Sequence, residues 1–237
     1  MADALTVVSN FAFVVPLVEA YGRGYVDMAA VYLFIVICSS MYHTCNSFYG
    51  ACAGLPPHVL HHLDFFFAQL IIPQTALFIV HVPQEWQRLK RMALLLVAFV
   101  IFLTLQFFEA TLMIQIIIGG VSFLFIALYW LVYALMHNGD LPPYDWNYFS
   151  MAIGLTSVSV SLFVVQMSMP SFYWANHSSW HVLAAWSQYW LLQIWGPIPA
   201  KERLIPERYV PLNRPAEKEF TWRPQATFRT FEAMKQK

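Results

Sequence analysis

The stretch Ala175-Asn176-His177-Ser178-Ser179-Trp180-His181-Val182-Leu183 opens the last long apolar run of the chain. His177 and His181 are four residues apart, and positions i and i+4 of an α-helix lie one above the other on the same face. Two imidazoles arranged in this way supply half of a tetrahedral zinc site. The alternative is that the histidines only hydrogen-bond across a helix bundle, because this spacing also occurs by chance.

The composition around this stretch is that of a membrane protein. The 237 residues are 59% hydrophobic and 11% charged, with a mean hydropathy of +0.54, whereas soluble domains carry about 25% charged residues. Lipid accepts only helices or closed barrels, and the apolar runs here are continuous rather than alternating. We therefore predict an all-α polytopic membrane protein. The formal net charge is zero, so the chain lacks the excess of positive charge that is typical of nucleic-acid binding, and no nucleic-acid partner is expected.

Seven apolar runs of roughly 17 to 25 residues predict a bundle of seven transmembrane helices. They cover residues 4–21, 28–47, 59–81, 92–108, 112–136, 148–169 and 177–196. Residues 1–197 are therefore expected to form one seven-helix transmembrane domain. Residues 198–237 are polar and rich in proline, which predicts a tail outside the bilayer.

The cations predict the orientation of these spans. Of the thirteen Lys and Arg residues, four are Arg23, Arg88, Lys90 and Arg91, and all the others lie in the tail. With seven spans, every one of them falls on the same side of the membrane. The positive-inside rule then predicts an extracellular N-terminus and a cytoplasmic C-terminus.

This topology brings polar side chains from three spans to one depth near the outer leaflet. The second span ends with His43, the third begins around Asp64, and the seventh begins with His177 and His181. Three neutral imidazoles and a water molecule form a familiar zinc site with an open position. Ser39 precedes His43 by one helical turn, so it lies on the same face and can support the bound water or a ligand.

Asp64 is followed directly by Phe65-Phe66-Phe67. A carboxylate in such surroundings is costly unless it is paired, protonated or close to a cation, and a divalent metal would remove that cost. The neighbouring His61 and His62 are expected to be interfacial rather than ligands.

The three cysteines do not form an even disulfide framework. Cys38, Cys45 and Cys52 lie within fifteen residues of one another, and Cys45 could bridge to Cys52 if that loop faces an oxidising compartment. The spacing leaves this alternative open.

The ordered set Ser39-x-x-x-His43, Asp64 and His177-x-x-x-His181 resembles the signature of the CREST superfamily of seven-span proteins. That group includes alkaline ceramidases, progestin and adipoQ receptors, and the branch of transmembrane-protein-eight and myomaker proteins. The local sequence favours the last branch, with the myomakers as the best match. The stretches similar to it are Val31-Tyr32-Leu33-Phe34, Tyr42-His43-Thr44-Cys45-Asn46 and His177-Ser178-Ser179-Trp180-His181.

The resemblance implies a site and a cellular role. It implies zinc held by His43, His177 and His181, with Asp64 binding the metal through a water molecule and Ser39 supporting the site. It also implies a multi-pass plasma-membrane protein that promotes myoblast fusion during myogenesis. One departure is that the tail contains no cysteine, so the acylation expected of a vertebrate myomaker tail is not available.

Two functions follow from these observations. The first is cell–cell fusion, in which the bundle binds membrane lipids and meets an opposing membrane or a fusion partner protein. Gly119-Gly120 or Ala184-Ala185 would then allow a homodimer, although such pairs also serve ordinary packing within one chain. The alternative is a zinc-dependent lipid amidase or esterase of the alkaline-ceramidase type. In that case Asp64 and Ser39 are the catalytic residues, with Asp64 as the base that acts on a zinc-activated water.

Overall fold

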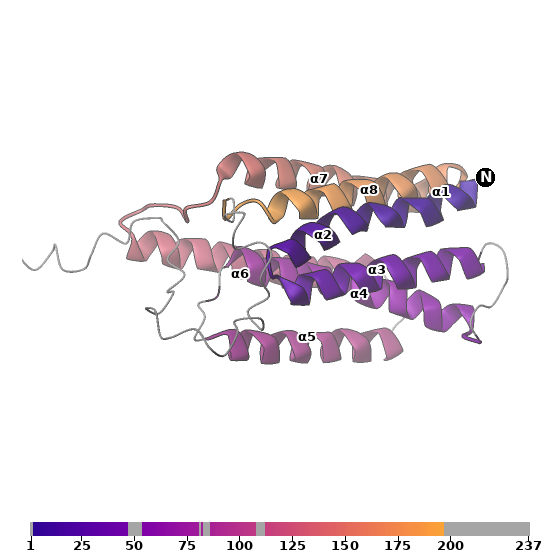
Figure 1. The fold of residues 1–237 in the computed structure, drawn as a ribbon, viewed down its shortest axis with the longest axis horizontal. Helices are drawn as coiled ribbons and strands as arrows, with labels where there is room; N and C mark the ends of the chain where they lie inside the picture. The colour runs from indigo at the N-terminus through magenta and orange to yellow at the C-terminus, as the bar shows by residue number, and fades with distance from the viewer. Residues whose placement is uncertain (1, 47–53, 81, 83–85, 108–111, 197–237) are drawn as a thin grey trace, which may run out of the picture. The chain divides into compact units, whose positions relative to one another are not determined.

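The computed structural model describes residues 2–46, 54–80, 82, 86–107 and 112–196. Over these ranges the elements are helical, as predicted (Figure 1). In chain order they are α1 (Ala2–Ser9), η1 (Asn10–Phe13), α2 (Val14–Gly22), α3 (Val26–Thr44), α4 (Pro57–Ile79), α5 (Gln87–Phe107), α6 (Leu112–Met136), α7 (Trp146–Ser168), η4 (Pro170–Phe172) and α8 (Tyr173–Leu191). The helices belong to one compact unit. The predicted tail, residues 198–237, lies outside the described residues.

Six helical stretches in the described ranges are long and apolar enough to cross a membrane. They are Ala4–Gly22, Val26–Thr44, Pro57–Ile79, Gln87–Phe107, Met113–Met136 and Trp146–Gln166. Each overlaps one of the first six predicted spans. The chain is thus a multi-pass membrane protein, since water would expose these apolar stretches at prohibitive cost.

The seventh predicted span is the helix α8, which does not belong to those six. With 19 residues, α8 is as long as α3, but it carries asparagine, histidine, serine and glutamine side chains that lower its hydropathy. Several of these polar side chains, among them His177, His181 and Ser187, are buried against other helices. The polar side chains that lower the hydropathy of α8 therefore face the interior of the bundle.

The first span is interrupted by the 3-10 segment η1, which separates α1 from α2. Pro16 follows this segment and has no backbone N–H to donate to the preceding turn, which favours such a break. The buried polar side chains Thr6, Ser9 and Asn10 lie just before or within it. The N-terminal half of this span therefore turns a polar stripe toward the bundle, and α1 packs against α8.

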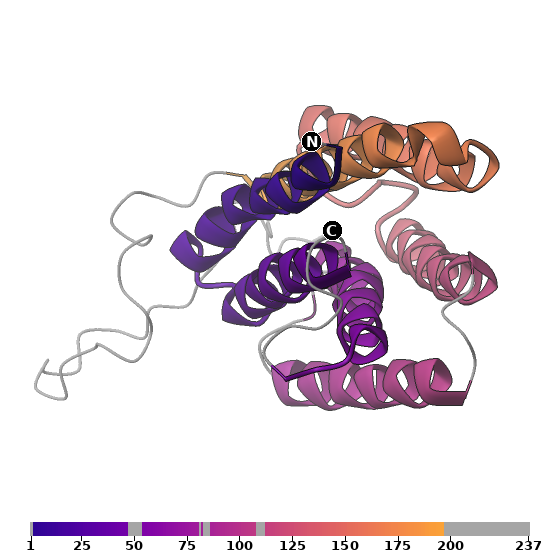
Figure 2. The ribbon, with the colours of Figure 1, turned by 90° about the vertical axis from the view of Figure 1, so that its right-hand side faces the viewer.

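The helices differ in how much of their surface is covered. In the most apolar window of α3 half of the residues are buried, against 11% in α5 and 6% in α6. Figure 2 shows α5 at the edge of the unit, whereas α7 and α8 run side by side. The exposed leucine, isoleucine and phenylalanine side chains of α5 and α6 are suited to contact with lipid tails. A Cβ atom built on Gly119 or Gly120 meets no atom within 4 Å, so these glycines do not mark a close helix contact within the described chain.

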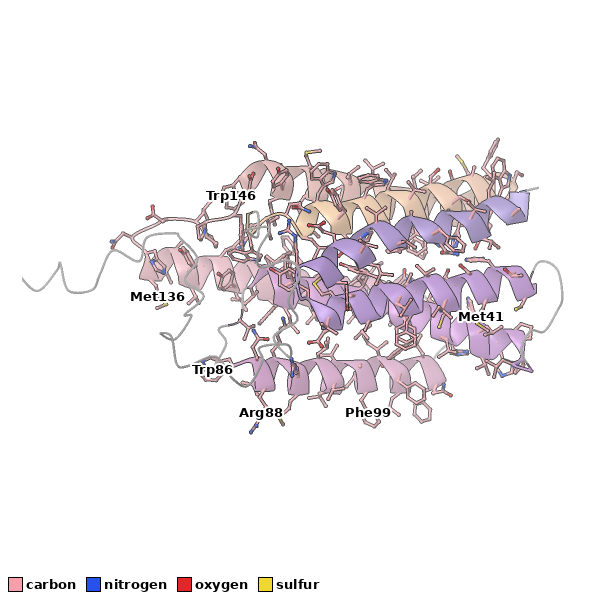
Figure 3. All side chains as sticks on the ribbon, in the orientation of Figure 1. Met41, Trp86, Arg88, Phe99, Met136 and Trp146 are labelled. Atoms are coloured by element: carbon pink, nitrogen blue, oxygen red, sulfur yellow. The ribbon has the colours of Figure 1, made fainter. Side chains whose placement is uncertain are left out.

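Buried polar contacts close one end of the bundle. Arg23 donates from Nε to Glu19 Oε1 at 2.5 Å, from Nη1 to Gly196 O at 3.0 Å, and from Nη2 to Gln193 Oε1. These bonds join the end of α2 to the segment that follows α8. Figure 3 shows Arg88 at this end of the unit and Met41, two residues from His43, near the other end. Arg88 and the end of α3 that bears His43 are therefore separated along the length of the helices.

Candidate metal centre

The structure brings His43, His177 and His181 together. One nitrogen of each imidazole can be chosen so that the three atoms all lie within 4.8 Å of one another. The ring centroids of His177 and His181 are 4.5 Å apart, and that of His43 is 4.9 Å from His177. The predicted convergence of three histidines from α3 and α8 is confirmed. The cluster is buried, and it could bind a metal ion.

The local sequence explains where each helix carries its histidines. His43 lies in the last turn of α3, and His177 and His181 lie on one face of α8, one turn apart. Tyr173, a further turn back on the same face, stacks on His177 with a centroid distance of 4.9 Å. The i, i+4 spacing therefore places two imidazoles, and the end of α3 supplies the third.

The spacing of one pair of nitrogens is close to that on a tetrahedral ion. Two imidazole nitrogens on one zinc ion, each about 2.0–2.1 Å from it, lie about 3.3–3.4 Å apart in tetrahedral geometry. His43 Nε2 and His177 Nε2 are 3.2 Å apart. The side chains are well shielded, because His43, His177 and His181 are 6%, 7% and 2% exposed. The spacing of this pair is therefore compatible with a metal ion such as zinc, and all three nitrogens lie within 4.8 Å of one another.

Asp64 and Ser39 lie at the edge of this cluster. Asp64 Oδ2 is 3.9 Å from His43 Nε2, and its side chain is 13% exposed. Ser39 is 2% exposed and lies one turn before His43. Its hydroxyl neighbours Asp64 but has no hydrogen bond of standard geometry within the described part of the chain. The arrangement leaves a carboxylate and a hydroxyl close to the three imidazoles.

Two further residues that the sequence interpretation missed contact the histidines from other helices. Ser9 Oγ, on α1, is 2.9 Å from His181 Nδ1. Gln166 Oε1, on α7, is 3.0 Å from His177 Nδ1. Both residues are buried. A signal was present in each case, because a serine beside Asn10 in the first apolar run and a glutamine near the end of the sixth are costly in lipid unless they face a polar partner.

The other histidines of the described ranges do not join the cluster. His61 packs between aromatic rings, with centroid distances of 4.8 Å to Tyr42 and 4.6 Å to Phe65. His62 Nδ1 donates to the backbone oxygen of His58 at 2.6 Å. His61 and His62 are therefore not among the three histidines whose nitrogens converge.

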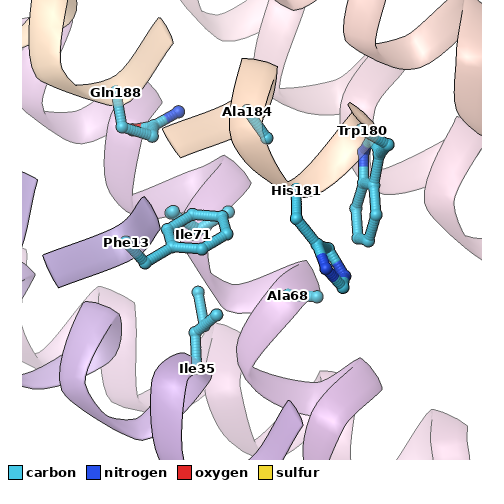
Figure 4. Close-up of a pocket in the computed structure, with 8 residues that line it drawn as sticks. All are labelled: Phe13, Ile35, Ala68, Ile71, Trp180, His181, Ala184 and Gln188. Carbon is cyan, nitrogen blue, oxygen red and sulfur yellow. The ribbon is translucent and has the colours of Figure 1, made fainter. Parts of the chain in front are cut away.

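A small cavity of about 50 Å³ adjoins the cluster on the side of the bundle interior. Its lining is mostly apolar, with His181 and Gln188 as the polar members: Phe13, Ile35, Ala68, Ile71, Trp180, His181, Ala184 and Gln188. Figure 4 shows the His181 imidazole at one side of this space and the Phe13 ring at the other. An apolar chain in this cavity would therefore lie against a histidine of the cluster.

Cys45 follows α3 directly and is disulfide-bonded. The predicted partner, Cys52, lies outside the described residues. Cys38, one turn before Tyr42, is buried and free.

Two curated proteins resemble most of the chain. The mouse protein "Post-GPI attachment to proteins factor 6" is 27% identical over 198 residues, which cover 81% of this chain and 25% of that protein. The human protein of the same name is 26% identical over 196 residues, with the same coverage of both chains. The chain spans about a quarter of the length of the curated relatives it matches.

These relatives overturn the predicted assignment to the myomaker branch, and with it the predicted role in myoblast fusion. The error has a chemical origin. The motifs around His43 and His177 consist largely of site residues and of the aromatic residues beside them. Short motifs of this kind report the chemistry of a shared site, whereas a branch is distinguished by the far larger number of positions outside it.

One family model matches residues 1–182, a range that contains His43, Asp64, His177 and His181. It therefore covers the whole histidine cluster and most of the described helices. The chain belongs to the family described as "Protein of unknown function (DUF3522)".

Proposed function

We propose that this protein is a zinc-dependent hydrolase that cleaves an ester or amide bond of a membrane lipid. The observation that carries the proposal is the buried set of three imidazoles with a carboxylate at its edge, where Asp64 Oδ2 is 3.9 Å from His43 Nε2. Three neutral nitrogen donors with a further open position are typical of catalytic zinc, whereas structural zinc sites are closed by four protein ligands.

The roles of the residues follow from their positions. His43, His177 and His181 hold the ion, which when bound supplies Lewis acidity and an activated water for hydrolysis. The Asp64 carboxylate lies where it can take a proton from an attacking water and return it to the leaving group. Ser39 supports the site from the preceding turn of α3, where its buried hydroxyl neighbours Asp64.

The chemical class of the substrate is supported by the cavity and by the relatives. The cavity is lined by apolar side chains and touches His181, so it suits the first methylene groups of a fatty acyl chain next to the bond that is cleaved. The relatives are named for a step that follows GPI attachment to proteins. The lipid portion of a GPI anchor commonly carries fatty acyl esters. We therefore propose acyl esters of GPI-linked phosphatidylinositol as the substrate class.

The proposed topology places the site in the outer leaflet. In this topology α8 is the seventh span, the N-terminus is extracellular, and the plasma membrane is the site of action. Two observations support it. Arg88 lies at the other end of the unit from the histidine cluster, as the positive-inside rule requires. Cys45, beside His43, is disulfide-bonded, and disulfides persist in oxidising compartments.

Purified protein in lipid nanodiscs tests the reaction directly. The substrates are fluorescent GPI-linked phosphatidylinositol and, as a comparison, labelled ceramide and phosphatidylcholine. Release of fatty acid only after zinc loading is the expected result, with the GPI lipid preferred. If ceramide alone is hydrolysed, the substrate class is an amide and not the proposed ester. Absence of any release from fully zinc-loaded protein would refute the proposed hydrolase.

A further inference from the structure

The Nδ1 atom of each histidine of α8 faces a residue of a different helix, and the Nε2 atom of His177 faces His43. His181 Nδ1 meets Ser9 on α1, and His177 Nδ1 meets Gln166 on α7. These contacts decide where each imidazole carries its proton, because a neutral imidazole has one N–H and one lone pair.

The tautomer of His177 follows from its partner. Gln166 faces it with the amide oxygen, at 3.0 Å from Nδ1, and a carbonyl oxygen only accepts hydrogen bonds. His177 therefore donates from Nδ1 and keeps its lone pair on Nε2. That Nε2 atom is the one that lies 3.2 Å from His43 Nε2.

The tautomer of His181 follows from the hydrogen bonds of Ser9. The Ser9 hydroxyl donates its single proton to the backbone oxygen of Thr6 at 2.8 Å. It is therefore left as an acceptor for His181 Nδ1, which lies 2.9 Å away. His181 consequently donates from Nδ1 and also presents the lone pair of Nε2.

We propose that Ser9 and Gln166 are positioning residues that hold His181 and His177 with Nδ1 protonated, so that both rings offer Nε2 to one metal ion. This inference rests on the metal centre of the proposed function. Residues that accept a hydrogen bond from a ligating histidine fix its orientation and raise its basicity as a ligand. Zinc affinity thus depends on α1 and α7, although neither helix supplies a ligand.

The test uses the full chain in nanodiscs, with zinc affinity measured by chelator competition and the ligand field read from the absorption of the cobalt-substituted protein. Ser9→Ala and Gln166→Leu are each expected to weaken zinc binding by about 10- to 100-fold and to change the cobalt spectrum. Ser9→Thr and Gln166→Glu keep an acceptor and are expected to bind zinc within a few-fold of the wild type. Ser161→Ala is the matched control, since Ser161 is exposed on α7 and donates only to Ser157 O.

The outcomes separate this inference from the proposed function. Wild-type affinity and an unchanged cobalt spectrum in both Ser9→Ala and Gln166→Leu would refute the positioning role while the metal centre stands. Equal loss in Gln166→Leu and Gln166→Glu would refute it as well, because only the former removes the acceptor. A wild type that binds no zinc would refute the inference together with the metal centre. Zinc binding that depends on Ser9 and Gln166, without lipid hydrolysis, would refute only the proposed reaction.

Nitrogen-15 NMR of the histidines measures the tautomers independently of zinc affinity. If Ser9→Ala does not fold, the comparison of Gln166→Leu with Gln166→Glu decides.

Discussion

His43 and His177 face each other through their Nε2 atoms at 3.2 Å, although 134 residues separate them in the chain. Only the packing of α3 and α8 in the same bundle brings them to this distance. The spacing is close to that of two nitrogens on one tetrahedral zinc ion. It also allows a direct hydrogen bond between the rings, so measurements of metal binding distinguish a metal centre from a polar contact.

Replacement of His181 should remove the bound metal. His181→Ala takes away one of three ligands at the buried end of the cluster, and we expect zinc content to fall from about one equivalent to near zero. Elemental analysis of the purified protein measures it. His62→Ala is the control, because His62 is hydrogen-bonded to His58 O outside the cluster. Equal zinc content in wild type and His181→Ala would contradict the proposed ligation.

Zinc should stabilise the folded protein. A ligand that binds only the folded state adds about 2.7 kcal/mol when its concentration is 100 times the dissociation constant. We expect addition of zinc to raise the melting temperature of the metal-stripped wild type and to leave that of His181→Ala unchanged. Differential scanning fluorimetry in detergent measures both, and equal shifts in the two proteins would show that the effect is not specific to the cluster.

Asp64 is expected to act in catalysis rather than in metal retention. Asp64→Asn keeps the size of the side chain and removes the base, and the loss of a general base lowers rates by about 100- to 10,000-fold. Zinc content should remain near that of the wild type, because Asp64 is 3.9 Å from His43 and is not one of the three nitrogen donors. Fatty-acid release and elemental analysis on the same preparation check this pair of expectations. Unchanged turnover would remove Asp64 from the mechanism.

The cavity next to His181 should set the acyl-chain preference. Ala184 lines that cavity, and Ala184→Phe would fill most of its volume of about 50 Å³. We expect hydrolysis of fatty acyl substrates to fall about tenfold or more, with zinc content and hydrolysis of acetyl substrates, which lack these methylene groups, little affected. Val182→Phe, on an exposed part of α8, controls for the added ring. An equal loss for all chain lengths would indicate that the cavity does not hold the chain.

Arg23 should stabilise the opposite end of the bundle. Its side chain is 1% exposed and is paired with Glu19, whose side chain is 23% exposed. Loss of one partner of a buried pair costs about 3–5 kcal/mol; because Glu19 keeps some contact with water, we expect about 2–4 kcal/mol for Arg23→Met.

Arg91→Met provides the comparison for Arg23. Arg91 Nε is 3.7 Å from Asp27 Oδ2, and the two side chains are 70% and 51% exposed. Exposed pairs of this kind contribute about 1 kcal/mol or less. Unfolding in mixed micelles measures the free energy of both variants, and similar losses would show that burial does not distinguish the two pairs.

Much of the architecture could be predicted from the sequence because a lipid environment restricts the choices. Long apolar runs must be helices in a bilayer, so the spans from 28–47 to 148–169 overlap α3 to α7. The break at Asn10–Phe13 was not predicted. A hydropathy pattern averages over such a segment, whereas Pro16 and the polar stripe before it act locally.

The predicted myomaker branch was wrong. The motif at His177–His181 correctly indicated a clustered pair of imidazoles. These few residues do not by themselves distinguish a fusion protein from a relative of post-GPI attachment to proteins factor 6. The length of sequence matched by the relatives carries the distinction.

The sequence by itself determined that the chain is a helical membrane protein and that His177 and His181 lie on one face of a helix, whereas the approach of His43 to this pair depends on the packing of α3 and α8. Residues one helical turn apart lie on the same face, so the histidine pair on α8 could be predicted from its spacing. Only the tertiary structure shows that Ser9 and Gln166 lie next to the Nδ1 atoms of His181 and His177, and that an apolar cavity lies beside His181. Such partners come from helices distant in the chain, and their choice depends on how the helices rotate and pack against one another, which no local pattern encodes.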